Sequence, residues 1–225
     1  MRTSLFRSLG PAALALACAM TLGSTLSAQH KPAAKSTSKA PAKSTAPAKL
    51  GPGEYATFST SKGSFVVELF TKEAPKAVAN FVALATGKQP YRTSMGGLSM
   101  SPYYNSLLFF RTIPGYMIQT GDQLNNGTGK MMNTLPFEKN NLKFDVAGRM
   151  ALAQTPGDPN SRGAQIFFTL KPVQPLDKEG YLIIGQIVQG LDVAQALAEG
   201  PRRAGQSDVP QYPNILNKVT IQDVH

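Results

Sequence analysis

Arg111 is the residue of this sequence whose type and setting point most directly to chemistry. It stands in the segment FFRTIPGYMIQTGD, residues 109–122, among apolar, aromatic and amide side chains. No histidine or cysteine accompanies it there, and the one carboxylate, Asp122, closes the segment. A guanidinium keeps its charge at any ordinary pH, so it donates hydrogen bonds and exchanges no protons. The segment therefore predicts a site that acts by hydrogen bonding.

The composition of the chain excludes histidine and cysteine chemistry. The two histidines are His30, in a low-complexity segment, and His225, the last residue, while the only cysteine is Cys18. These positions argue against Ser-His-Asp or Cys-His hydrolysis and against the usual zinc ligand patterns. Gly96-Gly97 and Gly127-Thr-Gly129 are too short to be phosphate-binding loops. The acids are scattered over apparent loops, which disfavours the pair of catalytic carboxylates that a glycosidase needs. We therefore expect no metal and no cofactor.

Two interpretations of Arg111 remain open from the residues alone. In one, it points outward from a strand and pairs with a surface acid. In the other, it lines a water-poor groove of Phe, Met, Tyr and Leu side chains that accepts an extended peptide, with Gln119 as a second hydrogen-bonding group. Such a groove is sufficient for rotation about an Xaa–Pro bond, whose barrier of about 20 kcal/mol reflects amide resonance. A guanidinium hydrogen bond toward the prolyl nitrogen would lower that barrier.

The elements that must position these residues are short strands and two helices. One helix is predicted with a cap at Thr71, Pro75 in its first turn and Gly87 at its end, and a second over 192–198. A long polar loop is expected over 88–106. Strands are expected over 55–60, 64–70, 107–112, 116–120, 148–153, 166–170, 182–188 and 219–224. We predict a mainly β domain, a closed eight-stranded antiparallel β-barrel capped by two α-helices, although a sandwich has the same periodicity.

Two segments precede this domain. Residues 1–28 carry early arginines, an apolar stretch and small residues at the end, a pattern typical of an export signal cleaved near Ala28. Lipid attachment at Cys18 is the alternative. Residues 29–50, rich in Ala, Lys, Pro, Ser and Thr, cannot bury enough apolar surface to become ordered, so a disordered tether is predicted. The domain is predicted over 51–225, in the periplasm or otherwise exported.

The positive charge of the chain is concentrated in these N-terminal segments. The net charge is +10, but seven of the 23 basic residues lie among the first 50 residues, which contain no acid. The rest of the chain holds 16 basic and 13 acidic residues and is close to neutral. We therefore expect no nucleic-acid partner, and contact with a membrane only through the basic tether or a lipid anchor.

The segment 109–122 resembles the signature F-H-R-x-I-P-G-F-M-x-Q-x-G-D of the cyclophilins, the peptidyl-prolyl cis-trans isomerases. Other stretches that resemble the family are 75–87, 126–129, 150–153, 163–167, 176–177 and 181–185. The resemblance covers residues 54–224. It implies an eight-stranded barrel capped by two helices and an enzyme that accelerates Xaa–Pro isomerisation. Together with the predicted export signal, this makes exported proteins the expected substrates. A non-catalytic peptide-binding or scaffold module on the same fold is the alternative.

The resemblance also implies roles for individual residues. Arg111 would be the catalytic guanidinium, Gln119 and the backbone around Leu152 would bind substrate carbonyls, and Tyr181 stands where the family has a pocket histidine. The proline pocket would consist of Tyr116, Met117, Phe167 and Leu176, and the groove floor and its extension of Gly127, Ala151, Ala153 and Gln165. The partners would be proline-containing peptides and folding exported proteins, bound by a monomer.

Several positions depart from the family pattern. Phe110 replaces a non-catalytic histidine, and Leu152 replaces an asparagine that acts mainly through its backbone. Gln174 or Pro175 occupies the place of a tryptophan that matters to cyclosporin binding, and the chain contains no tryptophan. We therefore expect catalysis to be retained and inhibition by cyclosporin to be weak. The loop over 154–162 is longer than usual and could reshape access to the groove.

Overall fold

The computed structural model describes residues 49–129, 134–155, 158 and 162–225. The predicted export signal lies outside the described residues, and so does the predicted tether apart from its last two residues. Among the described residues, no helix is long and apolar enough to cross a membrane.

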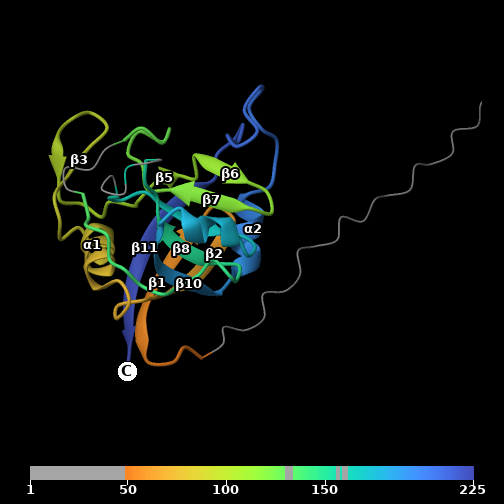
Figure 1. Cartoon of the computed structure of the whole chain (residues 1–225). Coiled ribbons are helices and arrows are strands. Elements are labelled where there is room, and N and C mark those ends of the chain that lie inside the picture. Colours follow the sequence, from red (N-terminus) through yellow and green to blue (C-terminus); the bar gives the residue numbers. More distant parts are fainter. Residues whose placement is uncertain (1–48, 130–133, 156–157, 159–161) are drawn as a thin grey trace, which may run out of the picture. The chain divides into compact units, whose positions relative to one another are not determined.

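Short strands and two short α-helices make up the described part of the chain (Figure 1). The strands are β1 Gly53–Thr60, β2 Gly63–Leu69, β3 Tyr91–Arg92, β4 Leu98–Ser99, β5 Leu107–Leu108, β6 Arg111–Ile113, β7 Met117–Thr120, β8 Arg149–Leu152, β9 Ile166–Thr169, β10 Leu182–Gln189 and β11 Ile215–Val224. The helices are α1 Pro75–Ala85, α2 Leu191–Leu197 and a short 3₁₀-helix, Gln174–Lys178. The prediction of a mainly β domain with two α-helices is confirmed.

Nine of the described strands form one antiparallel sheet, in the order β5-β11-β1-β2-β10-β8-β9-β7-β6. The sheet curls into an open half-barrel, so the predicted closed eight-stranded barrel is wrong. The strand predicted over 107–112 is divided into β5 and β6, which become the two edges of the sheet. Other parts of the chain pair with N–H groups on the open side of each edge strand: Thr112 N of β6 donates to Asp208 O (2.8 Å) and Leu108 N of β5 donates to Asn125 Oδ1 (2.8 Å). Because these donors are already paired, no strand ladder closes the barrel.

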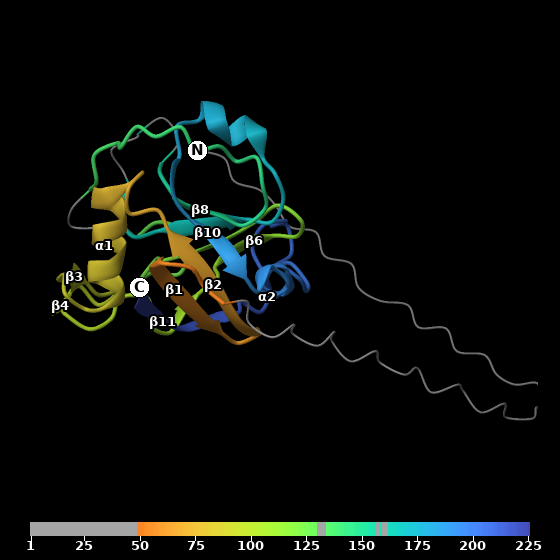
Figure 2. The ribbon, with the colours of Figure 1, turned by 90° about the horizontal axis from the view of Figure 1, so that it is seen from below.

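Helices α1 and α2 lie on opposite sides of the curled sheet, as both views show (Figures 1 and 2). The core between them is aromatic. Phe81 of α1 lies 6.0 Å from Phe58, which stacks on Phe65 at 4.9 Å between ring centroids. Phe168 meets both of these strand residues edge-on at 5.2 Å, and Leu197 of α2 is also buried. This core supports the sheet from its inner face.

The segment predicted as a polar loop over 88–106 contains a small separate hairpin, β3–β4. Tyr91 of this hairpin is buried, and its ring packs edge-on against Tyr103 at 4.7 Å. This contact ties the loop to the core, and no periodic pattern in the sequence indicates it. Of the other long loop, predicted over 154–162, five of the nine residues lie outside the described residues.

Helix α1 begins without its predicted cap. Thr71 is not at the helix N-terminus, where the capping position is held by Ala74, whose side chain accepts no hydrogen bond. Glu138, far along the chain, takes this role: its carboxylate accepts from Lys76 N (2.9 Å) and Ala77 N (2.7 Å). A negative charge is favourable there because free N–H groups and the helix dipole both point toward it. A tertiary contact thus replaces the local cap.

Replacing Glu138 with alanine is expected to lower the free energy of unfolding by about 1–2 kcal/mol, because two N–H groups of α1 lose their acceptor. Urea denaturation followed by circular dichroism measures this change. Glu138→Gln keeps an acceptor oxygen without the charge, so its loss is expected to be smaller. If Glu138→Ala and the natural chain have the same urea midpoint of unfolding, water replaces the carboxylate as the acceptor without loss of stability.

Candidate functional site

Four neighbouring strands bring one residue each into a row across the sheet. Arg111 of β6 pairs with Gln119 of β7, Gln119 with Phe167 of β9, and Phe167 with Ala151 of β8. Directly paired residues point to the same face of a sheet, and the next residue along each strand points to the other. The next row is fully buried in the core: Thr112, Ile118, Phe168 and Met150. Arg111 and Gln119 therefore lie on the outer face of the half-barrel.

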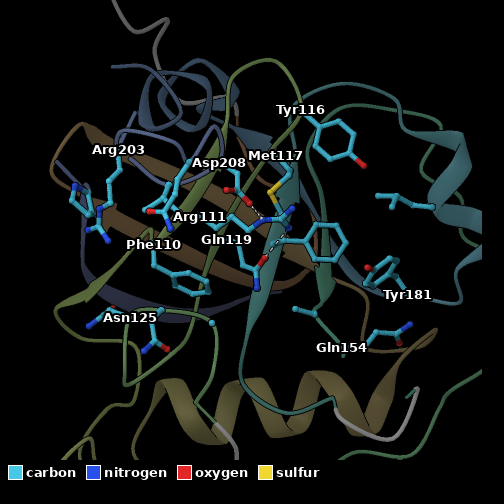
Figure 3. Close-up of a pocket in the computed structure, with 18 of the residues that line it drawn as sticks. Phe110, Arg111, Tyr116, Met117, Gln119, Asn125, Gln154, Tyr181, Arg203 and Asp208 are labelled. Carbon is cyan, nitrogen blue, oxygen red and sulfur yellow. Dashed lines mark hydrogen bonds and ion pairs between the residues drawn. The ribbon is translucent and has the colours of Figure 1, made fainter. Parts of the chain in front are cut away.

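A cavity of about 630 Å³ opens on this outer face (Figure 3). Nine of the predicted site residues line it: Arg111, Tyr116, Met117, Gln119, Gly127, Ala153, Phe167, Leu176 and Tyr181. They come from strands β6, β7 and β9, from the 3₁₀-helix and from the loops around them. The fold thus brings residues that are up to 70 positions apart into one site.

One side of the cavity is apolar. Met117, Phe167 and Leu176 are buried there. Tyr181 meets the ring of Phe167 edge-on, with 5.1 Å between the centroids and 77° between the planes. Burial raises the pKa of the Tyr181 hydroxyl above its ordinary value, so this group is neutral at physiological pH. A second apolar layer lies beneath: Phe144, Ala151, Val173 and Ile183. This side forms an apolar recess suited to a saturated ring.

Next to these apolar residues, the lining of the cavity is polar and connected by hydrogen bonds. Arg111 Nε donates to Asp208 Oδ2 (2.8 Å), and Arg111 Nη1 reaches Gln119 Oε1 at 3.5 Å. Gln119 Nε2 donates to Gln165 Oε1 (3.0 Å), and Gln165 Nε2 donates to Gly127 O (3.3 Å). Figure 3 shows the guanidinium between Asp208 and Gln119. These contacts orient the polar groups without a ligand.

Arg111 both pairs with an acid and lines a cavity, so the structure contains the geometric part of each interpretation that the sequence leaves open. Its side chain is 41% exposed and pairs with Asp208, which is 39% exposed, and it also lines the cavity. The hydrogen bond from Arg111 lowers the pKa of Asp208 below its ordinary value, so the carboxylate is ionised at neutral pH. Within the described ranges, no three His, Cys, Asp or Glu residues gather closely enough to hold a metal ion.

Three of the predicted site residues do not line the cavity. Ala151 lies in the apolar layer beneath it. Leu152 follows Ala151 in β8, and strand alternation turns its side chain into the main core, where it is fully buried. Gln165 lies behind Gln119 and holds it by the hydrogen bond described above.

Ten further residues line the cavity and were not predicted: Phe110, Asn125, Asn126, Gln154, Glu179, Arg203, Gln206, Asp208, Val209 and Pro213. Half of them belong to the connection between α2 and β11. That connection follows Arg111 by about ninety residues and has no periodic pattern that would place it at the sheet edge. The sequence offered one signal for this connection, namely the interpretation in which Arg111 pairs with an acid. That interpretation did not distinguish Asp208 from the other acids.

The loop that carries Gly127 is held by a buried carboxylate. Asp122 is 1% exposed and accepts hydrogen bonds from Leu124 N (2.9 Å), Asn126 N (3.1 Å) and Gly127 N (2.6 Å). Gly129 passes close by, and a Cβ there would lie 1.8 Å from Asp122 Oδ1. Asp122 therefore shapes one wall of the cavity and does not face into it as a reactive group.

The curled sheet and its cavity define a cyclophilin-like domain, and comparison with known proteins supports this. The family model for the cyclophilin type peptidyl-prolyl cis-trans isomerases matches residues 55–224. A crystal structure of a cyclophilin type peptidyl-prolyl cis-trans isomerase from Cryptosporidium parvum is similar with a TM-score of 0.64 and 26% identity, over 76% of this chain and 99% of that one. A second structure of that protein, in the presence of the dipeptide Ala-Pro, gives a TM-score of 0.63 and 27% identity with the same coverage.

Sequence relatives carry the same class name. Peptidyl-prolyl cis-trans isomerase-like 1 of Emericella nidulans is 36% identical over 147 residues, which is 63% of this chain and 79% of the relative. Peptidyl-prolyl cis-trans isomerase A of Mycobacterium tuberculosis is 32% identical over 169 residues, 74% of this chain and 91% of the relative. The chain therefore belongs to the cyclophilin family of peptidyl-prolyl cis-trans isomerases and is an enzyme of this class.

Proposed function

We propose that the enzyme accelerates rotation of Xaa–Pro bonds in exported proteins through a hydrogen bond from Arg111 to the prolyl nitrogen. The observation that carries the proposal is the position of Arg111 and Gln119 in one cavity with the apolar recess at Met117 and Phe167, where Gln119 pairs directly with Phe167 on the neighbouring strand. The proline ring occupies the recess, and Gln119 holds a carbonyl of the bound peptide. A related structure, from Cryptosporidium parvum, was obtained in the presence of Ala-Pro, which supports proline-containing peptides as the ligands.

The chemistry follows from the electronic structure of the amide. In the planar ground state the nitrogen lone pair is shared with the carbonyl, which produces a barrier of about 20 kcal/mol. In the twisted transition state the nitrogen is pyramidal and its lone pair is free to accept a hydrogen bond. The bond from Arg111 is therefore stronger in the transition state than in the ground state, which is the condition for catalysis. No covalent bond forms and no proton is transferred.

A protease-coupled assay on an Ala-Pro peptide tests the proposal. The protease cleaves only the trans isomer, so the slow phase reports cis-to-trans rotation, which takes tens of seconds without a catalyst. We expect the rate constant of the slow phase to rise in proportion to the concentration of residues 51–225. A slow phase equal to that of the uncatalysed reaction would favour the alternative, a non-catalytic peptide-binding module.

The activity is expected to change little between about pH 6 and pH 9, because the guanidinium of Arg111 does not titrate there. The neighbouring groups agree with this, since the pKa of Asp208 is lowered and that of Tyr181 is raised. Because the pKa of Asp208 is lower in the folded state than in the unfolded chain, its pairing with Arg111 stabilises the fold at any pH above the unfolded-state pKa of about 3.9. This stabilisation is lost as the pH falls through the pKa of Asp208 in the folded state. Measurements of kcat/KM across the neutral range check this expectation, and a bell-shaped profile centred near neutrality would contradict it.

The proposal that the substrates are exported proteins is supported by the pattern of residues 1–28, which is typical of a signal for export. Mass spectrometry of the chain isolated from a bacterial host, with its cell envelope fractionated, measures the mature N-terminus. We expect cleavage near Ala28 and recovery from the periplasm. A lipidated N-terminus at Cys18 would indicate a membrane anchor instead, and a retained Met1 in the cytoplasm would exclude export.

A further inference from the structure

The connection between α2 and β11 is attached to the edge of the sheet next to the site. Thr112 N of β6 donates to Asp208 O (2.8 Å), so this connection pairs with the edge where another strand would lie. Arg202 Nη1 donates to Thr112 Oγ1 (2.7 Å), and Arg203 N donates to Val209 O (2.9 Å). These bonds fix the backbone on both sides of Asp208. Its carboxylate is therefore presented from a defined position beside Arg111.

The carboxylate of Asp208 and the amide of Gln119 contact different nitrogens of the same guanidinium. Asp208 Oδ2 accepts from Nε of Arg111 at 2.8 Å, while Gln119 Oε1 lies 3.5 Å from Nη1. A guanidinium is planar and rigid, so contacts at two of its nitrogens fix the direction of its remaining N–H groups. The bond at Nε is charge-assisted and short, and it is the stronger of the two.

We propose that Asp208 is a positioning residue for the isomerase reaction: it holds the guanidinium of Arg111 in the orientation that donates to the prolyl nitrogen. This rests on the proposed function of Arg111. Asp208 does not carry the reaction itself, and it is not one of the residues of the apolar recess, which come from β7, β9 and the 3₁₀-helix. Loss of the carboxylate therefore frees the arginine to swing without changing the recess. The expected result is a fall in kcat with an unchanged KM.

Steady-state kinetics of Asp208→Ala measure this split. We expect kcat to fall about tenfold and KM to change by less than about twofold, because misorientation of a catalytic group lowers turnover more than binding. Asp145→Ala is the matched control. Asp145 also accepts a 2.8 Å hydrogen bond from an arginine, Arg149, but neither residue lines the cavity. Removing this second ion pair is expected to leave both kinetic constants unchanged.

Nuclear magnetic resonance of the arginine side chain gives a readout that is independent of turnover. The Nε–H signal of Arg111, assigned by its loss in Arg111→Lys, is expected to exchange slowly with water in the natural chain and rapidly in Asp208→Ala.

If Asp208→Ala does not fold, as judged by circular dichroism, Asp208→Asn takes its place. Asparagine keeps the size of the side chain and removes the charge, so we expect its kcat to lie between those of the natural chain and the alanine variant.

A folded Asp208 variant with kcat within about twofold of the natural value would overturn the proposal, since orientation then does not depend on the carboxylate. An increased kcat would overturn it as well, because the carboxylate would then be restraining the arginine in an unproductive position. A higher KM with unchanged kcat would assign Asp208 to peptide binding instead. Failure of the proposed function is a different result: the natural chain and the Asp145 control would then both be inactive.

Discussion

Replacing Arg111 with alanine is expected to lower kcat/KM for an Ala-Pro peptide by about two to three orders of magnitude, the usual cost of losing one donor that acts mainly in the transition state. The fold is expected to survive, because Arg111 is half-exposed and its ion pair with Asp208 is also partly exposed. Such a pair contributes at most about 1 kcal/mol to stability. Protease-coupled kinetics and thermal unfolding, measured on the same preparation, separate the two effects.

Two variants make this result specific. Arg149→Ala removes an arginine of β8 that also pairs with an aspartate but does not line the cavity, and it is expected to leave kcat/KM unchanged. Arg111→Lys keeps the positive charge and removes the planar fork, so a large loss of activity would show that geometry matters as well as charge. Full activity in a folded Arg111→Ala variant would refute the role proposed for this residue.

Replacing Asp122 with alanine is expected to have the largest effect on stability, a loss of about 3 kcal/mol or more in the free energy of unfolding, because buried backbone donors lose a charged acceptor. The three donors are the N–H groups of Leu124, Asn126 and Gly127. Since Asn126 and Gly127 line the cavity, we also expect a higher KM in whatever fraction remains folded. Urea denaturation and steady-state kinetics measure these two consequences.

The asparagine variant distinguishes the carboxylate from the space that it fills. Asp122→Asn has the same size but replaces one acceptor oxygen with an NH₂ group, so it is expected to retain part of the stability. Gly129→Ala is expected to destabilise the same loop, since its Cβ would lie within 1.8 Å of the carboxylate. If Asp122→Ala unfolds at the same urea concentration as the natural chain, water has replaced the carboxylate and the loop does not depend on it.

Much of the fold and of the site could be predicted from short-range patterns. The β1–β2 hairpin and both α-helices were expected close to where they occur, because turn glycines and apolar periodicity act within a few residues. Arg111, Gln119 and Phe167 were named from their segments. Their common row across β6, β7 and β9 is a matter of strand register, which the structure supplies. The residue types indicate what the site can do, and the register determines that they meet.

The errors share a different origin. The barrel was expected to close, yet Thr112 N at one edge donates to Asp208 O, and Leu108 N at the other edge donates to Asn125 Oδ1. The cap of α1 was expected at Thr71 and comes from Glu138. In each case a local pattern was outweighed by a contact or a register that depends on the folded sheet.

The sequence by itself determined the chemistry that we propose for this protein. A permanently charged arginine stands among apolar and amide side chains, and histidine and cysteine are confined to other parts of the chain, so hydrogen bonding is the means of catalysis that we infer. Only the tertiary structure decided which partner orients that arginine. Asp208 is 97 residues away from Arg111, and several acids of the chain were chemically equivalent candidates. The choice among them is made by the backbone bond between Asp208 and Thr112 at the sheet edge, which exists only once the sheet has formed.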